Sequence, residues 1–473
     1  MSNPHFGIVN GLDAVGVADD LLRRLKEHSA EVLLEGAAFP VGGDCAMGSS
    51  LSERKIRVFN AIQTLAKEQV DLVLLPCFLC HTFLDEIEEE TTLQIVDMMA
   101  ALHNHLVSQF PRANKIGILT SGFVRDSCLF ERYFPEENWR LLYPDEEQQY
   151  DCTMSFLSVP EKNHSRSGEV ISALTGVCSD LVNKGAEVII PASAQFLMLT
   201  SALQKRGFPI VDINAAYVEY ALSKTRGKKA KPFKIGVVGG VGPAATVDFV
   251  NKIVNNTPAS RDQEHIKLVV EQNPQIPDRT ANLLNGGTDP TLALYSACKR
   301  LEADDASIIA IPCNTAHAFV ERLQPHLSIP IVNMLRETVE YIKTSCGDRK
   351  TVGLLATNGT ISSRVYHDVI TPAGFEVRVP DEENQQRVMR AIYGPKGVKA
   401  GYTQGECTED LLRALTSLVD DGAEIIVLGC TELPLLISEN ERFAVGGKTV
   451  TVLDPTAILA RKCIALAGRS QEN

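Results

Sequence analysis

Ile308-Ile-Ala-Ile-Pro-Cys313-Asn-Thr-Ala-His317 joins a short apolar run, rich in β-branched residues, to a polar turn. Similar apolar runs occur at 71–76, 115–120 and 351–356, and each precedes a longer amphipathic stretch. Runs of this length without polar alternation are typical of strands buried on both faces of a parallel sheet. The alternation of such strands with helices predicts an α/β fold.

The opening stretch has an earlier copy in Leu75-Pro-Cys77-Phe-Leu-Cys80-His81. Cys77 and Cys313 are 236 residues apart (313 − 77), and the strand-like runs that begin at 115 and 351 have the same offset (351 − 115). The Gly-Ala-Glu motifs at 185 and 422 are 237 residues apart (422 − 185). A register held over this distance indicates an internal duplication. Sub-motifs also occur twice within each copy, which predicts two α/β lobes around a cleft in each unit.

A basic stretch that contains glycine and proline, 223–233, separates the two copies. Such a composition is typical of an exposed linker, although a solvated helix end or a nuclear-import patch would look similar. The predicted organisation is a first unit over 1–225, a linker over 226–232 and a second unit over 233–473.

The composition sets limits on the class of protein. The chain has 473 residues, 44% hydrophobic and 22% charged, and this predicts a soluble globular protein of two or more domains. A net charge of −13 argues against nucleic-acid and membrane partners. We expect no membrane span and no secretory signal, so the expected location is cytoplasmic and the twelve cysteines are expected to be reduced. An anionic substrate would need local cations.

Two cysteines of the second copy follow strand-like runs. Cys313 follows 308–312, and Cys430 follows Ile425-Ile-Val-Leu-Gly429. In open α/β sheets, reactive groups collect where a strand ends and its helix begins, and a helix N-terminus there lowers the pKa of a thiol. Inversion of an amino acid at Cα needs a base on one face and an acid on the other. Two thiols in matched contexts meet that need.

Six motifs of the second copy occur in the order found in a known family. From Phe233 to Gly468 the chain resembles the aspartate/glutamate racemase superfamily, and in particular its pyridoxal-independent aspartate racemases. The motifs are Gly239-Gly-Val-Gly-Pro243, Asn273-Pro-Gln-Ile-Pro-Asp-Arg-Thr280, Pro312-Cys-Asn-Thr-Ala-His317, Ala356-Thr-Asn-Gly-Thr360, Val398-Lys-Ala-Gly401 and Gly429-Cys-Thr-Glu-Leu-Pro434.

The resemblance implies a fold, a reaction and a set of site residues. It implies tandem racemase-like units, each of two parallel-sheet lobes around a cleft, and interconversion of L- and D-aspartate, with glutamate as the next candidate, without pyridoxal phosphate, metal or nucleotide. Cys313 and Cys430 would transfer the protons. Arg279 and Lys399 would supply the local cations, and arginine can hold a carboxylate through two parallel hydrogen bonds. The other implied substrate-binding positions are Gly240, Asn314, Thr315, Thr357, Asn358, Thr360 and Thr431.

The first copy lacks most of these groups. Ser193 stands where Cys430 does, and a serine hydroxyl is too weak an acid–base group to replace a thiol unaided. Cys77 and His81 are retained. We therefore expect no two-base racemase activity in this unit. The other counterparts are Phe78 and Leu79 for Asn314 and Thr315, Gln195 for Glu432, a glycine near Gly42 for Arg279, and Lys162 for Lys399.

Several alternatives stay open at this stage. Gly240–Ala245 fits a dinucleotide-binding fingerprint, but the acidic Glu271 lies 31 residues on (271 − 240), farther than the usual ~20. Cys77 and Cys80 form a CxxC pair without a second ligand pair at zinc spacing. The function alternatives are a racemase or isomerase of another amino or dicarboxylic acid, or a non-enzymatic dicarboxylate sensor. The assembly would be a monomer with pseudo-dimeric units or a homodimer.

Overall fold

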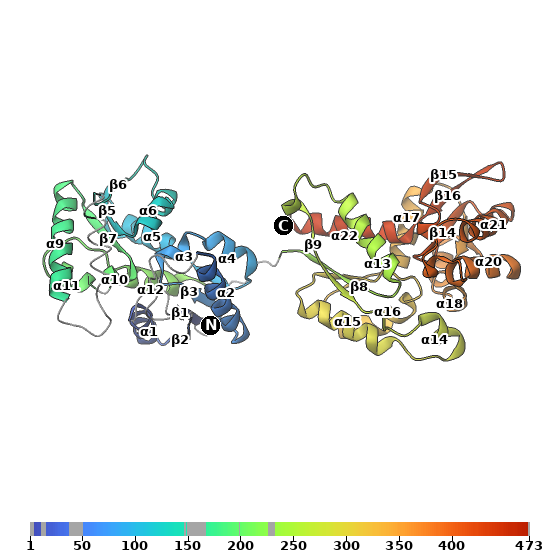
Figure 1. Ribbon diagram of the computed structural model, residues 1–473, viewed down its shortest axis with the longest axis horizontal. Coiled ribbons are helices and arrows are strands. Elements are labelled where there is room, and N and C mark those ends of the chain that lie inside the picture. Colours follow the sequence, from blue (N-terminus) through green and yellow to red (C-terminus); the bar gives the residue numbers. More distant parts are fainter. Residues whose placement is uncertain are drawn as a thin grey trace. The chain divides into compact units, whose positions relative to one another are not determined.

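The computed structural model describes residues 4–10, 16–36, 51–145, 148, 167–197, 199–225 and 232–471. The chain forms two compact units, Met1–Ala230 and Lys231–Asn473, each with its own sheets and core (Figure 1). Of the predicted linker, residues 226–231 lie outside the described part. No helix among the described residues is long and apolar enough to cross a bilayer.

The first unit contains two parallel sheets. Four strands form one sheet in the order β2-β1-β3-β4, and three strands form the other in the order β6-β5-β7. The first sheet consists of β2 (Glu31–Gly36), β1 (His5–Asn10), β3 (Leu72–Leu74) and β4 (Gln94–Val96), and the second of β6 (Arg140–Leu142), β5 (Lys115–Thr120) and β7 (Val188–Ala192).

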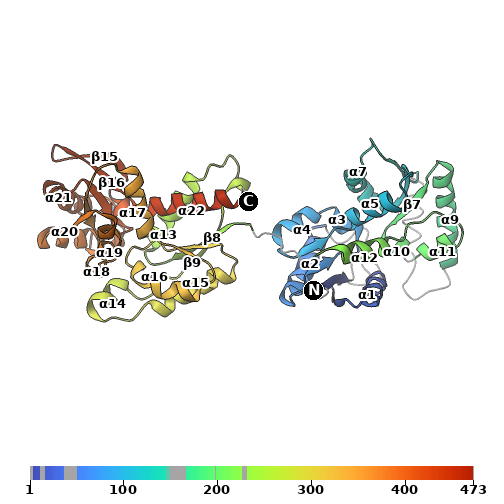
Figure 2. The same ribbon diagram turned by 180° about the vertical axis from the view of Figure 1, so that it is seen from behind.

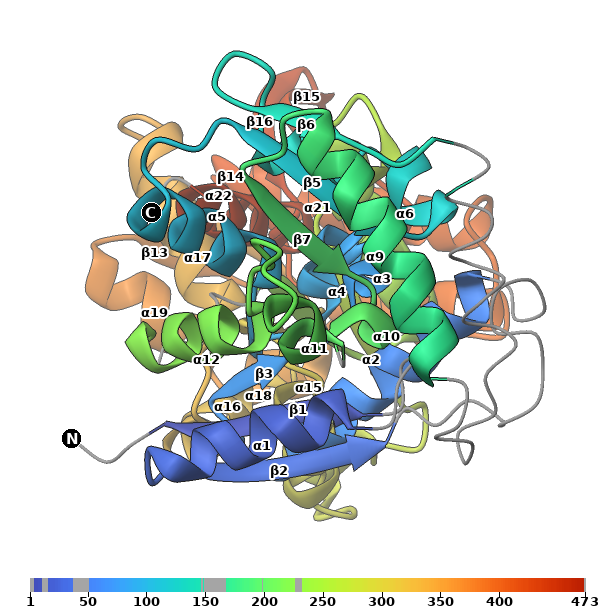
Figure 3. The same ribbon diagram turned by 90° about the vertical axis from the view of Figure 1, so that its left-hand side faces the viewer.

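Helices cover both faces of the second of these sheets. Figure 3 shows α9 (Ser167–Asn183) and α5 (Met98–Gln109) on opposite sides of β5 and β7. The apolar runs supply side chains to both layers: Ile189 packs against α9, whereas Ile116 and Ile118 pack toward α5. Both faces of these strands are therefore buried, as the unalternating sequence pattern predicts.

The second unit also contains two sheets, with the orders β11-β10-β8-β9 and β13-β12-β14-β16-β15. All of their pairings are parallel except that of β15 with β16. The first sheet consists of β11 (Ile331–Val332), β10 (Ile308–Ala310), β8 (Lys234–Gly239) and β9 (Lys267–Gln272), and the second of β13 (Glu376–Arg378), β12 (Thr351–Leu355), β14 (Ile425–Leu428), β16 (Lys448–Leu453) and β15 (Asn440–Val445). The prediction of parallel-sheet α/β lobes is confirmed.

The antiparallel hairpin of β15 and β16 was not predicted. Gly446 and Gly447 connect the two strands with φ angles of 56° and 73°. A two-residue hairpin turn with positive φ at both positions matches the right-handed twist of the strands it joins, and glycine adopts this conformation without strain. The hairpin adds an edge strand to an otherwise parallel sheet.

Two helix layers enclose the first sheet of the second unit. In Figures 1 and 2, α15 (Thr291–Ala303) and α16 (His317–Leu323) lie on one side of β8 and β9, with α13 (Pro243–Asn256) and α22 (Pro455–Gln471) on the other. Two separate apolar clusters fill the two interfaces. This layering fixes the carboxyl ends of the strands of this sheet, where Cys313 lies.

The remaining helices surround these sheets. In the first unit they are α1 (Val17–Glu27), α2 (Leu51–Lys67), α3 (Phe78–His81), α4 (Leu84–Glu90), α6 (Gly122–Asp126), α7 (Leu129–Tyr133), α10 (Ala194–Leu197), α11 (Thr200–Gln204) and α12 (Ile213–Ser223). In the second unit they are α14 (Arg279–Asn285), α17 (Met334–Ser345), α18 (Asn358–Ser362), α19 (His367–Ile370), α20 (Glu382–Tyr393) and α21 (Glu406–Asp420). Short 3₁₀ turns include η2 (Asp262–Glu264), η3 (Gln324–His326), η4 (Thr371–Ala373), η5 (Val398–Ala400) and η6 (Leu433–Leu435).

Candidate active site

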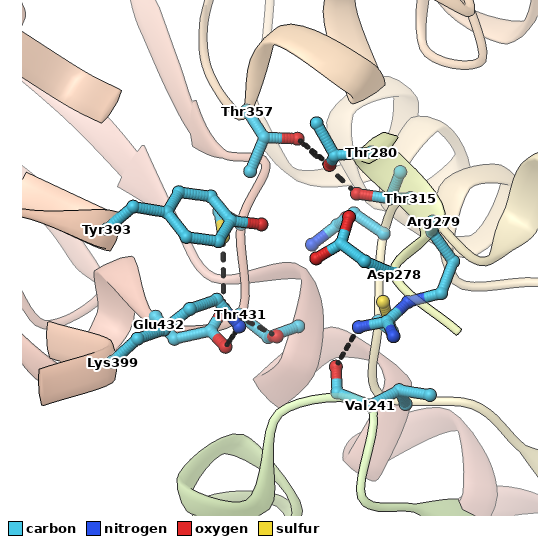
Figure 4. A pocket seen from close by; sticks show the side chains of 13 residues that line it. Val241, Asp278, Arg279, Thr280, Thr315, Thr357, Tyr393, Lys399, Thr431 and Glu432 are labelled. Carbon is cyan, nitrogen blue, oxygen red and sulfur yellow. Dashed lines mark hydrogen bonds and ion pairs between the residues drawn. The ribbon is translucent and has the colours of Figure 1, made fainter. Parts of the chain in front are cut away.

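A small pocket in the second unit lies where its two sheets present the carboxyl ends of their strands (Figure 4). Cys313 enters it from the turn after β10, and Cys430 enters it from the turn after β14. The two thiols thus come from different sheets and line one cavity. The lining residues are Val241, Asp278, Arg279, Thr280, Cys313, Asn314, Thr315, Thr357, Tyr393, Lys399, Cys430, Thr431 and Glu432.

The two cysteines are equally buried but have different charged neighbours. Cys313 is 6% exposed and Cys430 is 7% exposed. Cys313 contacts the guanidinium of Arg279, whereas the Sγ of Cys430 donates to the Oε2 of Glu432 at 3.0 Å. Burial, and then the nearby Glu432 carboxylate, raise the pKa of the Cys430 thiol well above its ordinary value. The two thiols of the pocket therefore have different electrostatic surroundings.

Two donors at the pocket are buried without a hydrogen-bond partner. They are the Nε of Arg279 and the Nδ2 of Asn314. The other guanidinium nitrogens of Arg279 donate to the carbonyl oxygens of residues 241, 276 and 277, so the group is held in place. The amide of Asn314 is oriented because its Oδ1 accepts from Tyr366 at 2.5 Å. Unmatched buried donors are costly, and a bound carboxylate would satisfy both.

Threonine hydroxyls form a connected network on one wall. The Oγ1 of Thr360 lies 2.8 Å from that of Thr315 and 3.1 Å from that of Thr357. Thr357 is also the N-cap of α18, since its side chain accepts from the Thr360 amide. Thr280 joins the network through Thr357 at 3.4 Å. Hydroxyls can donate or accept, so this wall can face either a carboxylate or an ammonium group.

Lys399 lines the pocket but is paired with a carboxylate. Its Nζ lies 2.7 Å from the Oε1 of Glu432, which is 4% exposed. Burial alone would lower the pKa of Lys399, but the contact with Glu432 raises it, so the ammonium stays charged. Arg279 and Lys399, which were expected to supply the local cations, both line the pocket, and Glu432 balances the charge of Lys399 there.

Three predicted positions are absent from the pocket wall. Thr360 lies behind Thr315 and Thr357 and supports them. The amide oxygen of Asn358, the first residue of α18, accepts from Gln385 of α20 at 2.8 Å. Gly240, with φ 83°, lies against the backbone of Asn273, where a Cβ would come within 2.3 Å of the carbonyl carbon. The close approach at Gly240 is thus to the chain's own backbone.

Five lining residues were not among the predicted site residues: Val241, Asp278, Thr280, Tyr393 and Glu432. Four of them lie inside or beside motifs that the sequence singled out. Tyr393 is the exception, because it comes from the C-terminal end of α20, and nothing in its local sequence marks it. Burial, and then the proximity of Cys430, raise the pKa of Tyr393 to about 12, so its hydroxyl stays protonated.

His317 pins the turn that carries Cys313. Its Nδ1 lies 2.9 Å from the carbonyl oxygen of Cys313, and its Nε2 accepts from the Met334 amide at 3.1 Å. The ring is therefore neutral, with its proton on Nδ1, and burial lowers its pKa to about 4. His81 makes the same two contacts with Cys77 and Met98 in the first unit. In each copy the histidine therefore joins the turn of the cysteine to the N-terminus of a later helix by two hydrogen bonds, an arrangement that we call the histidine clamp.

The histidine clamp predicts that the free energy of unfolding decreases at acidic pH. The folded-state pKa of His317 lies below its unfolded value of 6.5, so the unfolded chain binds the proton first. The stability it contributes is complete above pH 6.5 and falls toward pH 4, by about 3 kcal/mol in all. Thermal unfolding at pH 7.0 and 4.5 should show a smaller loss in His317→Gln than in the wild type. The exposed His326→Gln serves as the control. Equal losses in His317→Gln and the wild type would contradict the clamp.

The equivalent region of the first unit is more apolar. Phe78, the counterpart of Asn314, stacks on Phe130 at 5.8 Å between ring centroids and belongs to the core. The Ser193 hydroxyl accepts from a backbone amide of α10. Arg54, which the sequence did not suggest, approaches Cys77 with Nη1 4.0 Å from Sγ. Gly42, Lys162 and the side chain of Gln195 lie outside the described residues.

Comparison with known proteins gives one consistent family. A model of the family "Asp/Glu/Hydantoin racemase" matches the chain twice, over 16–221 and 238–463. The broad specificity amino-acid racemase RacX of Bacillus subtilis is 26% identical over 239 residues, which are 49% of this chain and 96% of that protein. The glutamate racemase of Shewanella oneidensis is 31% identical over 36% of this chain and 60% of its own length. The solved Picrophilus torridus aspartate racemase is 30% identical, with a TM-score of 0.44 over 50% of this chain and 94% of that one.

Proposed function

Because the chain belongs to the Asp/Glu/hydantoin racemase family and is an amino-acid racemase, we propose that its second unit, 233–473, interconverts L- and D-aspartate, with glutamate as the next candidate. The observation that carries the proposal is the convergence of Cys313 and Cys430 on one pocket from two sheets. The first unit, 1–225, has no second thiol at the matching position and is proposed to be inactive as a two-base racemase.

The reaction needs only groups that line the pocket. One cysteine, as thiolate, takes the proton from Cα as the C–H bond breaks, and its sulfur becomes a thiol. The other cysteine, as thiol, gives its proton to the opposite face of Cα and becomes a thiolate. The substrate carboxylate would accept from Arg279 and Asn314, which line the pocket and each have a buried donor without a partner. Charge that develops on this carboxylate as the C–H bond breaks is stabilised by the same donors.

The test is proton exchange at Cα in heavy water. The full chain is incubated separately with L-aspartate and L-glutamate, loss of the Cα signal is followed by proton NMR, and chirality is followed by chromatography. We expect exchange and racemisation of aspartate at a higher rate than of glutamate. Absence of exchange on both substrates would reject the proposed substrates.

One observation favours a second candidate, a racemase of broader specificity. Lys399 is balanced by Glu432, and Asp278 also lines the pocket, so the four charged groups of the lining sum to zero. With one cysteine thiolate added, the lining has no excess positive charge, so a zwitterionic amino acid can bind without a second carboxylate. The same exchange experiment with L-alanine, L-methionine and L-lysine separates the two candidates, because exchange of these at rates within tenfold of aspartate supports the broader one.

A further inference from the structure

Glu432 is a buried carboxylate with two partners. Its Oε2 accepts from the Sγ of Cys430 at 3.0 Å, and its Oε1 accepts from the Nζ of Lys399 at 2.7 Å. A buried carboxylate stays ionised only when a cation or several donors compensate it, and Lys399 does so here. An ionised carboxylate has no proton to donate, so the proton between Cys430 and Glu432 belongs to the sulfur.

The neighbours of Cys313 have the opposite sign. Arg279 hydrogen-bonds to this thiol, and a guanidinium is always a donor. A nearby positive charge stabilises a thiolate relative to a thiol. Cys313 and Cys430 are 6% and 7% exposed, so their access to solvent is alike, whereas their charged neighbours differ in sign.

We propose that Glu432 is a positioning residue that holds Cys430 as the thiol in the free enzyme, so that Cys430 begins the reaction as proton donor and Cys313 as acceptor. This rests on the proposed two-thiol reaction. The motif Gly429-Cys-Thr-Glu-Leu-Pro434 contains Glu432, but its sequence alone assigns no role to this residue.

The other groups that face Cys430 do not offset this effect. Tyr393 and Tyr366 both approach it, and both stay neutral because burial raises their pKa values. Lys399 opposes the effect of Glu432 on Cys430, but its ammonium is paired with the Glu432 carboxylate at 2.7 Å. The first copy supports the link between the two residues, because it has Ser193 and Gln195 at these positions and has lost both together.

The resting distribution of protons between the two cysteines affects turnover. After one inversion, Cys430 is a thiolate beside a carboxylate and Cys313 is a thiol beside a guanidinium, which is the less favourable distribution. One proton must pass from Cys313 to Cys430, directly or through solvent, before the free enzyme returns to its resting form. No other reactant is needed, because the number of protons in the site is unchanged.

Alkylation of the full chain tests this without any use of racemase activity. Iodoacetamide is neutral, so pocket charge does not bias its approach, and peptide mass spectrometry reports the two cysteines separately across pH 6–10. In the wild type we expect Cys430 to react at least about tenfold more slowly than Cys313 at pH 7.5, as a difference of one pH unit in midpoint requires. In Glu432→Gln, Cys430 should react at least about tenfold faster than in the wild type, with its midpoint at lower pH.

The control is Glu424→Gln, which makes the same change at the opposite end of β14, where the carboxylate accepts from the amides of residues 350 and 351. It should leave both cysteines unchanged. Equal rates and midpoints for Cys313 and Cys430 in the wild type would overturn the proposal, even if the Glu432 variant failed to fold. An unchanged Cys430 rate in folded Glu432→Gln would do the same. Absence of racemisation with the expected labelling would instead reject the proposed reaction alone.

Discussion

Cys430→Ser and Cys313→Ser are each expected to lower kcat for racemisation by at least about 10³-fold, because each removes one of two proton-transfer groups and such groups contribute about 10²–10⁴-fold. Serine keeps the size of the side chain, but its hydroxyl ionises at too high a pH to exchange a proton with Cα. The measurement is the initial rate of optical inversion from each enantiomer. A single variant that keeps more than a tenth of wild-type kcat would exclude the two-base role of that cysteine.

The remaining thiol of each variant gives a second, more specific result. Cys430→Ser retains Cys313 on one face of Cα, so it should still exchange the Cα proton of one enantiomer with heavy water without inverting it. Cys313→Ser retains Cys430 on the opposite face and should do so for the other enantiomer, but more slowly, because Glu432 holds Cys430 as the thiol. Loss of exchange with both enantiomers in a folded single variant would indicate that the two thiols do not act on opposite faces.

Two further cysteines serve as controls. Cys407 is 2% exposed in the same unit, and its Sγ lies near the carbonyl oxygens of residues 402 and 404, which a serine can also reach. Cys407→Ser should therefore keep the fold and the rate.

Cys77→Ser tests the assignment of activity to the second unit, and we expect kcat to change less than about twofold. A large loss in Cys77→Ser would show that the first unit contributes to the reaction.

The sequence predicted the features of this site that depend on strand ends. A buried apolar run followed by a cysteine places the thiol at the carboxyl edge of a sheet, and two such runs in one duplicated unit predict that both thiols meet a common cleft. The parallel sheets and the positions of Cys313 and Cys430 followed from this logic. Asn314, Thr315 and Thr431, which the family resemblance implied, lie in the turns after these strands and line the pocket.

The features that were missed depend on tertiary contacts. The pairing of Lys399 with Glu432 joins residues 33 apart in sequence, and nothing local distinguishes a paired lysine from an unpaired one. Tyr393 and Tyr366 reach the site from helix ends with no recurring motif. Asn358 was included because it stands in a motif with Thr357, yet a one-residue step on a helix turns a side chain by roughly 100° and directs it to Gln385.

Arg279→Met is expected to lower kcat/KM for aspartate by at least about 100-fold, since a hydrogen bond to a charged group contributes about 1.5–3 kcal/mol and the pair of Arg279 with Cys313 is lost as well. Three carbonyl oxygens hold the guanidinium in place, and its unmatched Nε is the donor left for a ligand. Arg279→Lys keeps the positive charge but not the planar guanidinium with its paired donors, so it should recover only a small part of the lost kcat/KM.

The kinetic pattern separates the two roles of Arg279. If it only binds the carboxylate of the ground state, KM rises and kcat is unchanged, whereas a role in holding the Cys313 thiolate lowers kcat. We expect both, because one guanidinium contacts the thiol and offers a free donor. Arg300→Met is the matched control, since Arg300 pairs with Glu271 on the surface of the same unit and lines no part of the pocket. Values of kcat and KM for Arg279→Met within threefold of the wild type would exclude Arg279 from the site.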